Sequence, residues 1–86
     1  MGRYFFDLFD GDRLTVDEDG TDVSSIAEVR RMGVATLAEI LREVGPLFAD
    51  DGSRRLAIEV RDATGHVLRV VLSFNIELSR ISSISP

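Results

Sequence analysis

Apolar and polar residues alternate along several stretches of this chain, and a period of two predicts β-strands. The first stretch, residues 3–9, is rich in aromatic side chains, which strands favour. Because successive strand residues point to opposite faces, each face of this strand receives a different set. One face carries Tyr4, Phe6 and Leu8, and the other carries Phe5, Asp7 and Phe9.

Three further stretches complete the predicted strands. Asp10-Gly11 is a typical hairpin turn, and residues 13–17 alternate as the returning strand before an acidic loop. Residues 56–61 alternate cleanly, as in a half-buried strand. A turn at residues 62–65 leads to residues 66–74, which are apolar enough for us to expect a central position in the sheet.

Between these strands, apolar residues recur every three or four positions and predict one long helix over about residues 25–44. Ser25 and Glu28 match a capping box, in which the serine accepts from an amide three residues on and the glutamate reaches back. Gly45-Pro46 predicts the end of the helix, with the glycine left-handed and the proline unable to continue it.

The order ββαββ predicts an α+β fold of two layers: a four-stranded antiparallel sheet with the helix packed on one face. With 86 residues and no repeats or linkers, residues 1–76 are expected to form a single domain. Residues 77–86 carry Leu78, Ile81 and Ile84 among serines and fit either a short helix or a strand, so their structure stays open.

A helix on one face leaves the other face of the sheet uncovered, and that face is partly apolar. We expect it to form an interface, with a homodimer or coverage by the C-terminal residues as the two main alternatives. The residues assigned to this interface are Phe5, Phe9, Val67, Arg69 and Val71.

Composition narrows the functional classes. The chain has no cysteine, which excludes disulfides, thiolate catalysis and cysteine zinc sites. The formal net charge of −5 argues against binding to nucleic acid or anionic lipid, because both need clustered cations. Since no apolar segment is long enough for a spanning helix or a signal peptide, we expect a cytoplasmic protein that does not bind membranes.

Carboxylates are dense near the N-terminus and could supply oxygen ligands to a divalent ion. A calcium loop that begins at Asp17 would end at Glu28, but Asp22 occupies the position that requires glycine. We therefore expect no metal site, and turn formation explains these acids better. The weak candidates are Asp10, Asp12, Asp17, Asp19, Asp22 and Glu28.

Parts for catalysis are missing from the sequence. His66 is the single histidine, next to a predicted turn, and no glycine-flanked serine elbow or phosphate-binding glycine loop occurs. We expect a protein that is not an enzyme and has no cofactor.

Four features form a pattern across residues 1 to about 76: the opening RYFFDL with its Asp10-Gly11 turn, the acidic stretch that closes in Asp19-Gly20, the alanine- and arginine-bearing helix, and residues 58–68. In these features the sequence resembles a family of small alphaproteobacterial proteins that is described only as a domain of unknown function. The serine-rich residues from Ser79 depart from that family. The resemblance implies no activity, ligand or catalytic residue.

Together these observations predict a small accessory or regulatory domain that acts through protein contacts, as a homodimer and with a protein partner still unknown. Two alternatives stay open. One is a module that binds a divalent ion or a small ligand through the acidic loops, and the other is an accessory domain of the antitoxin type.

Overall fold

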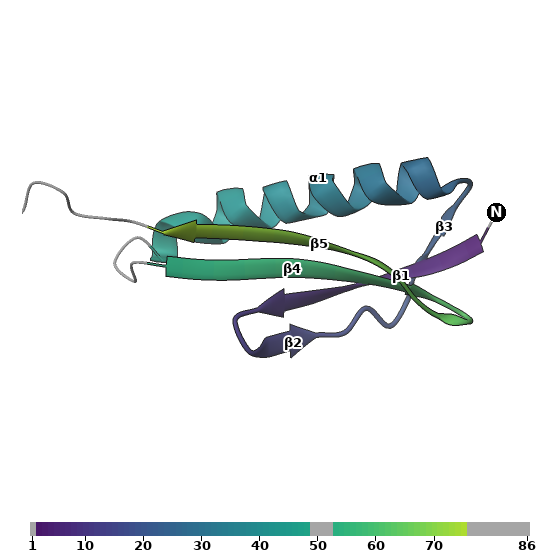
Figure 1. The fold of residues 1–86 in the computed structure, drawn as a ribbon, viewed down its shortest axis with the longest axis horizontal. Coiled ribbons are helices and arrows are strands. Elements are labelled where there is room, and N and C mark those ends of the chain that lie inside the picture. Colours follow the sequence, from purple (N-terminus) through teal and green to yellow (C-terminus); the bar gives the residue numbers. More distant parts are fainter. Residues whose placement is uncertain (1, 49–52, 76–86) are drawn as a thin grey trace, which may run out of the picture.

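The computed structural model describes residues 2–48 and 53–75, and within them it contains one helix and a five-stranded antiparallel sheet. The strands are β1 (Gly2–Asp10), β2 (Arg13–Thr15), β3 (Thr21–Val23), β4 (Ser53–Asp62) and β5 (Gly65–Asn75). The helix α1 (Ile26–Val44) runs along one side of the sheet, as Figure 1 shows. The predicted α+β class is confirmed, and the predicted tail at 77–86 lies outside the described residues.

The strand order is β2-β1-β4-β5, and this corrects two expectations. A fifth strand, β3, forms within the predicted acidic loop and pairs with the start of β1, where Gly2 lies opposite Val23. The last strand, β5, pairs with β4 alone and is therefore an outer strand, while β4 occupies the centre. The apolar residues of β5 had suggested a central strand. Most of them, however, pack against the core under the helix and need no second neighbouring strand; these are Val67, Leu68, Val70 and Leu72.

The helix begins and ends close to the predicted residues. Ser25 accepts from the amide of Glu28, as predicted, whereas the Glu28 carboxylate pairs with Arg31. The expectation of a left-handed Gly45 is wrong, since this residue has right-handed helical angles, φ −52° and ψ −48°. The chain continues from it into a 3₁₀ helix, η1 (Gly45–Phe48), because Pro46 fits the first turn of a new helix.

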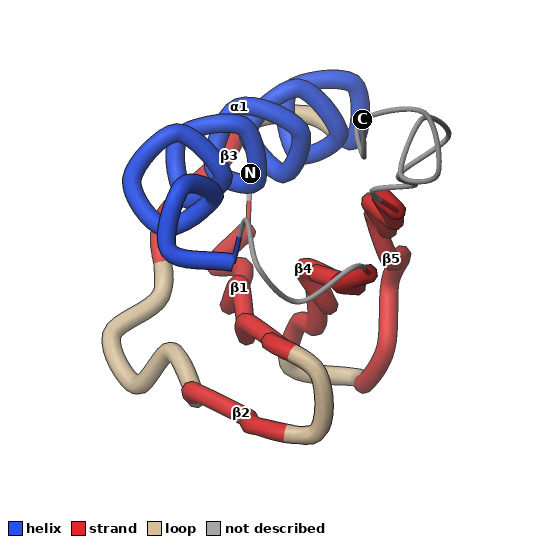
Figure 2. The backbone as a smooth tube through the Cα atoms, turned by 90° about the vertical axis from the view of Figure 1, so that its left-hand side faces the viewer, coloured by secondary structure: helices blue, strands red, loops and turns tan. Residues whose placement is uncertain are grey.

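The core lies between α1 and the middle of the sheet. The fully buried side chains Val29 of α1 and Leu56, Ile58 and Val60 of β4 form its centre. Tyr4, Phe6 and Leu8 of β1 pack against this cluster, as the alternating pattern predicted. Figure 2 shows α1 on one side of the sheet and β2 far from it, so the opposite face of the sheet has no described helix over it.

One predicted face assignment is wrong. Residues Val60 and Leu68 lie opposite each other, and the next pair is Arg61 with His66, so Val67 is the extra residue of a β-bulge. A bulge re-aims the side chains around it. Val67 consequently packs against the helix-side core instead of the open face, which removes it from the predicted interface.

Candidate functional site

The sheet face opposite α1, here called the open face, carries one apolar row that crosses the sheet. Strand register places Leu14 of β2 opposite Phe9 of β1, Phe9 opposite Ala57 of β4, and Ala57 opposite Val71 of β5. Ala57 is only 5% exposed, whereas Leu14 and Val71 are 50% and 42% exposed. Side chains at neighbouring register positions touch across strands, so this row is a continuous apolar strip.

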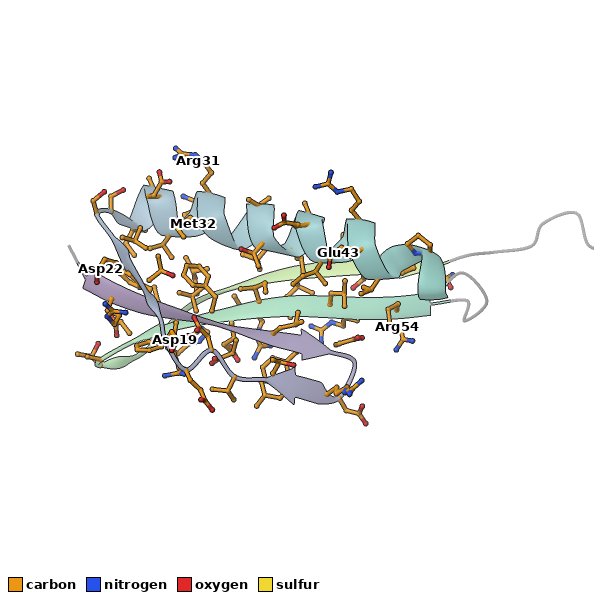
Figure 3. The ribbon with its side chains drawn as sticks, turned by 180° about the vertical axis from the view of Figure 1, so that it is seen from behind. Asp19, Asp22, Arg31, Met32, Glu43 and Arg54 are labelled. Carbon is orange, nitrogen blue, oxygen red and sulfur yellow. The ribbon has the colours of Figure 1, made fainter. Side chains whose placement is uncertain are left out.

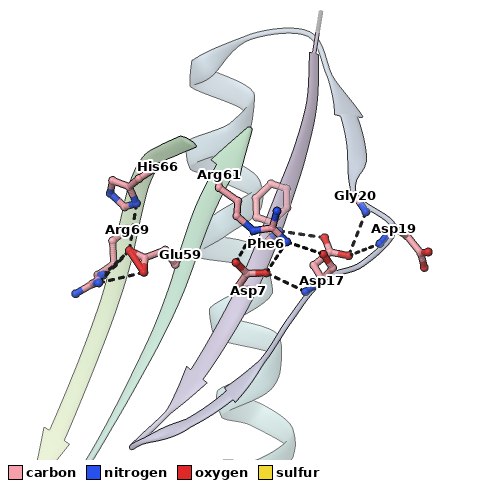
Figure 4. Close-up of polar contacts among 9 residues, drawn as sticks. All are labelled: Phe6, Asp7, Asp17, Asp19, Gly20, Glu59, Arg61, His66 and Arg69. Atoms are coloured by element: carbon pink, nitrogen blue, oxygen red, sulfur yellow. Dashed lines mark hydrogen bonds and ion pairs between the residues drawn. The ribbon is translucent and has the colours of Figure 1, made fainter. Parts of the chain in front are cut away.

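Next to the apolar strip lies a charged row. Asp7, Glu59 and Arg69 are register partners on β1, β4 and β5. Arg69 donates to both oxygens of Glu59, at 3.0 and 3.1 Å, and His66 Nδ1 lies 3.1 Å from Glu59 Oε2. Figure 4 shows these contacts together with those of Asp7.

Arg61 holds the other acid of this row. Its Nε donates to Asp7 Oδ2 at 2.8 Å, and its second terminal nitrogen donates to the carbonyl of Asp17 at 3.0 Å. The hydrogen bond to Asp7 is the largest cause of a raised pKa at Arg61. The guanidinium carbon also lies 4.6 Å from the centre of the Phe5 ring, which is cation–π distance.

Asp17 fills a gap along the edge of β1. Strand β3 pairs with residues 2–4 and β2 with residues 8–10, so neither reaches the amide of Phe6. The Asp17 carboxylate accepts from that amide at 3.0 Å, and from the amides of Asp19 and Gly20 at 3.2 and 3.1 Å. The Asp17 side chain therefore supplies the acceptor that a neighbouring strand would otherwise provide for the Phe6 amide (Figure 4).

These contacts lower the pKa of Asp17. The amide of Phe6 is the largest cause, the amides of Gly20 and Asp19 and the charge of Arg61 act in the same direction, and burial opposes them. The Asp17 amide in turn donates to Asp7 at 2.9 Å. We call Asp7, Asp17 and Arg61 the carboxylate clasp, because it ties the acidic loop to β1 and β4.

Gly20 closes the same loop where no side chain fits. Its φ is +74°, and a Cβ built there would lie 2.8 Å from Cε2 of Phe5. Both the backbone conformation and the space therefore require glycine. The chain bends at residues 18–19, and the contact of Gly20 with Phe5 depends on the fold.

The six predicted metal-ligand candidates are not brought together. Asp17 belongs to the clasp, Asp10 lies 3.7 Å from Arg54, Asp22 lies 3.6 Å from Arg3, and Glu28 pairs with Arg31. Figure 3 shows Asp19 in the loop before β3, Asp22 apart from it on β3, and Arg54 at the other end of the molecule. Asp12 lies exposed in the turn after β1. Within residues 2–48 and 53–75, no group of three or more His, Asp or Glu side chains is arranged to hold a metal ion.

Four of the predicted interface residues do lie together on the open face. Phe9, Arg69 and Val71 take part in the two rows, and Phe5 lies beneath Arg61. The sequence analysis missed Leu14, whose exposed side chain extends the apolar strip. The sequence shows that Leu14 lies between the polar residues Arg13 and Thr15. The face to which Leu14 points, however, follows from its pairing with Phe9.

Comparison with known proteins places the chain in a family without an assigned role. Residues 3–74 match the model of the family described as "Domain of unknown function (DUF6894)". The chain belongs to this family. Neither a curated protein nor a solved structure matches the chain. Among the described residues, no helix is long and apolar enough to cross a membrane.

The family match extends from the first residues of β1 almost to the end of β5. It therefore includes the whole open face and the carboxylate clasp. The expectation that the chain belongs to an uncharacterised domain family is therefore confirmed.

Proposed function

We propose that this DUF6894 domain is a non-catalytic protein-interaction domain whose contact surface is the open face of the sheet. The observation that carries the proposal is the apolar strip Leu14–Phe9–Ala57–Val71, which crosses four strands on a face with no described helix over it. Contiguous apolar surface on a small domain commonly marks a binding site.

The charged row beside the strip supports a binding role. Asp7 and Glu59 each accept from an arginine on the same face, so a partner could cover them without leaving a carboxylate unpaired. Buried charges are tolerated when they are paired and hydrogen-bonded. The same pairing occupies both carboxylates with hydrogen bonds from neighbouring arginines, which favours a structural role for them.

The solvent-facing part of the charged row indicates the chemistry of the partner. The carboxylate side chains are largely buried, with that of Asp7 11% and that of Glu59 20% exposed. The side chains of Arg61 and Arg69 are 37% and 47% exposed. Arg55, at the opposite side of the strip, is also exposed. A partner therefore meets guanidinium groups on both sides of an apolar strip, and we infer a partner segment with apolar side chains flanked by carboxylates.

Selection from a random peptide library on the immobilised full chain tests this proposal. We expect enrichment of peptides that combine aliphatic or aromatic residues with Asp or Glu. A selected peptide titrated into ¹⁵N-labelled protein is expected to shift the amide signals of Phe9, Ala57 and Val71.

The matched variants are Leu14→Asp on the strip and Ala35→Asp on the outer side of α1. Both residues are exposed, and both changes add the same charge. Peptide affinity should fall at least tenfold for Leu14→Asp and less than twofold for Ala35→Asp. Enrichment of basic peptides, or signal shifts confined to α1, would overturn the proposal.

A further inference from the structure

The outer edge of β5 is a second surface without a described partner. Within residues 2–48 and 53–75, β5 pairs with β4 and with no other strand. Its bulge is confined to Val67, and from Leu68 onward the register with β4 is regular. Residues 68–74 therefore present an uninterrupted row of backbone donors and acceptors along this edge.

This edge lacks the features that usually protect an outer strand. Proline, lysine, a bulge or a charge directed toward the edge normally prevents strand pairing with another molecule. Residues 68–74 contain neither proline nor lysine, and their single charged side chain, Arg69, is bonded to Glu59 on the neighbouring strand. The edge is thus open to a further strand.

The position of α1 is suited to a second copy at this edge. The helix packs against both β4 and β5, and a Cβ built at Gly33 would lie 3.1 Å from Val70 of β5. If the helix axis lies midway between these strands, strands spaced about 4.8 Å apart would bring the helices of two paired copies about 10 Å apart. That separation equals normal helix–helix packing distance.

The flank of α1 that would face the second helix is apolar. Strands β3 and β4 each run antiparallel to β1, so they are parallel to each other, and α1 connects them. Connections of this kind are right-handed in nearly all sheets. In this arrangement the residue about 100° beyond Gly33, Val34, lies on the flank toward β5. Val34 is 56% exposed. Met32 lies on the other flank, toward β3 and β1 (Figure 3).

We propose that a second copy of this chain pairs with it through β5, strand against strand and antiparallel. The twofold axis of such a pair is perpendicular to the sheet, so both helices lie on one side and both open faces on the other. The two apolar strips then meet through the Val71 residues and form one wider surface. This proposal does not depend on what the open face binds.

The area available is sufficient for a specific but weak dimer. Residues 68–74 span about 24 Å, and a sheet layer with a helix above it is roughly 20 Å high, which gives roughly 500 Å² per copy. About 1,000 Å² in total is at the lower limit of specific interfaces. We therefore expect association in the micromolar range.

Analytical ultracentrifugation of the full chain between 1 and 200 µM tests the proposal with three variants. Val34→Arg changes the helix flank at the seam, Leu14→Arg changes the open face, and Ala35→Arg changes the outer side of the helix. All three residues are exposed in the single chain, and circular dichroism checks that each variant remains folded. A Val34→Ser variant replaces Val34→Arg if the latter does not fold.

An edge dimer predicts that Val34→Arg weakens association at least tenfold, while Leu14→Arg and Ala35→Arg change it less than threefold. Amide exchange in β5 should also become slower as protein concentration rises. A chain that stays monomeric at 200 µM would overturn the proposal, whatever the reason that the edge of β5 does not pair. A dimer that is sensitive to Leu14→Arg but not to Val34→Arg would overturn it in favour of pairing through the open face.

Discussion

The carboxylate of Asp17 should be one of the larger single contributors to stability outside the hydrophobic core. In the Asp17→Ala variant, the amides of Phe6, Asp19 and Gly20 lose their acceptor. The amides of Asp19 and Gly20 lie in a loop where water can replace the carboxylate. The amide of Phe6 is part-buried between the two short strands, and water reaches it less easily.

The magnitude follows from this difference. A hydrogen bond to a charged group contributes about 1.5–3 kcal/mol, and an unsatisfied buried donor costs about 1–3 kcal/mol. Counting the Phe6 amide fully and the two loop amides only weakly, we expect Asp17→Ala to lower the free energy of unfolding by about 2–3 kcal/mol. Asp17→Asn retains one acceptor oxygen but no charge, and it should cost less.

Urea unfolding at pH 7, followed by circular dichroism, measures this loss. With a denaturant slope of about 1 kcal/mol per molar urea for a small domain, the midpoint should fall by roughly 2–3 M. Asp19→Ala is the matched control, because it removes an equal charge from the same loop and leaves the backbone contacts of Asp19 in place. If Asp17→Ala and Asp19→Ala unfold within 0.5 M urea of each other, the assignment of the clasp as a structural element is wrong.

The lowered pKa of Asp17 adds a dependence on pH. A carboxyl whose pKa is lower in the folded chain stabilises the fold above its unfolded pKa of about 4. This stabilisation is lost as the pH falls through the lower, folded value. The difference in unfolding free energy between the wild-type chain and Asp17→Asn should therefore be largest near neutral pH and shrink below about pH 4.

Two further predictions concern the same part of the fold. Gly20→Ala should destabilise by about 2–3 kcal/mol, because it combines a strained backbone with a clash against Phe5. Gly11 has a similar φ of +65°, but a Cβ there would meet nothing closer than 3.8 Å, so Gly11→Ala should cost only about 1 kcal/mol; equal losses in thermal unfolding would contradict this account. In a double-mutant cycle, Asp7→Ala and Arg61→Ala should show a coupling energy of about 1–2 kcal/mol, since the pair is hydrogen-bonded and Asp7 is buried; strictly additive losses would show that the pair does not interact.

Much of the secondary structure could be predicted because it depends on local patterns. Helix α1 follows from apolar spacing and the Ser25 cap, and the two hairpins follow from Asp-Gly and Gly65 turns between alternating residues. These signals act over a few residues, so they are present in the sequence itself. The exception within the helix is Gly45, whose local preference for a left-handed angle was overridden as the chain continued into η1.

The candidate surface could be predicted only in part. The alternation of β1 assigned Phe5 and Phe9 to the open face, and that assignment holds in the structure. Val67 was misplaced, because a single extra residue in β5 reverses the alternation at that point. The sequence carries no local sign of this bulge, because its position is defined only by the pairing of β5 with β4.

Local periodicity and turn residues were sufficient to predict α1, the strands β1, β2, β4 and β5, and the α+β class, but not β3 or η1. Only the tertiary structure decided that β4 lies in the centre, that Asp17 satisfies the amide of Phe6, and that Leu14, Phe9, Ala57 and Val71 align in one strip. These features join residues that are far apart in the chain. Their physical basis is strand register and the need of every buried amide for an acceptor, and both are fixed only when the whole sheet forms.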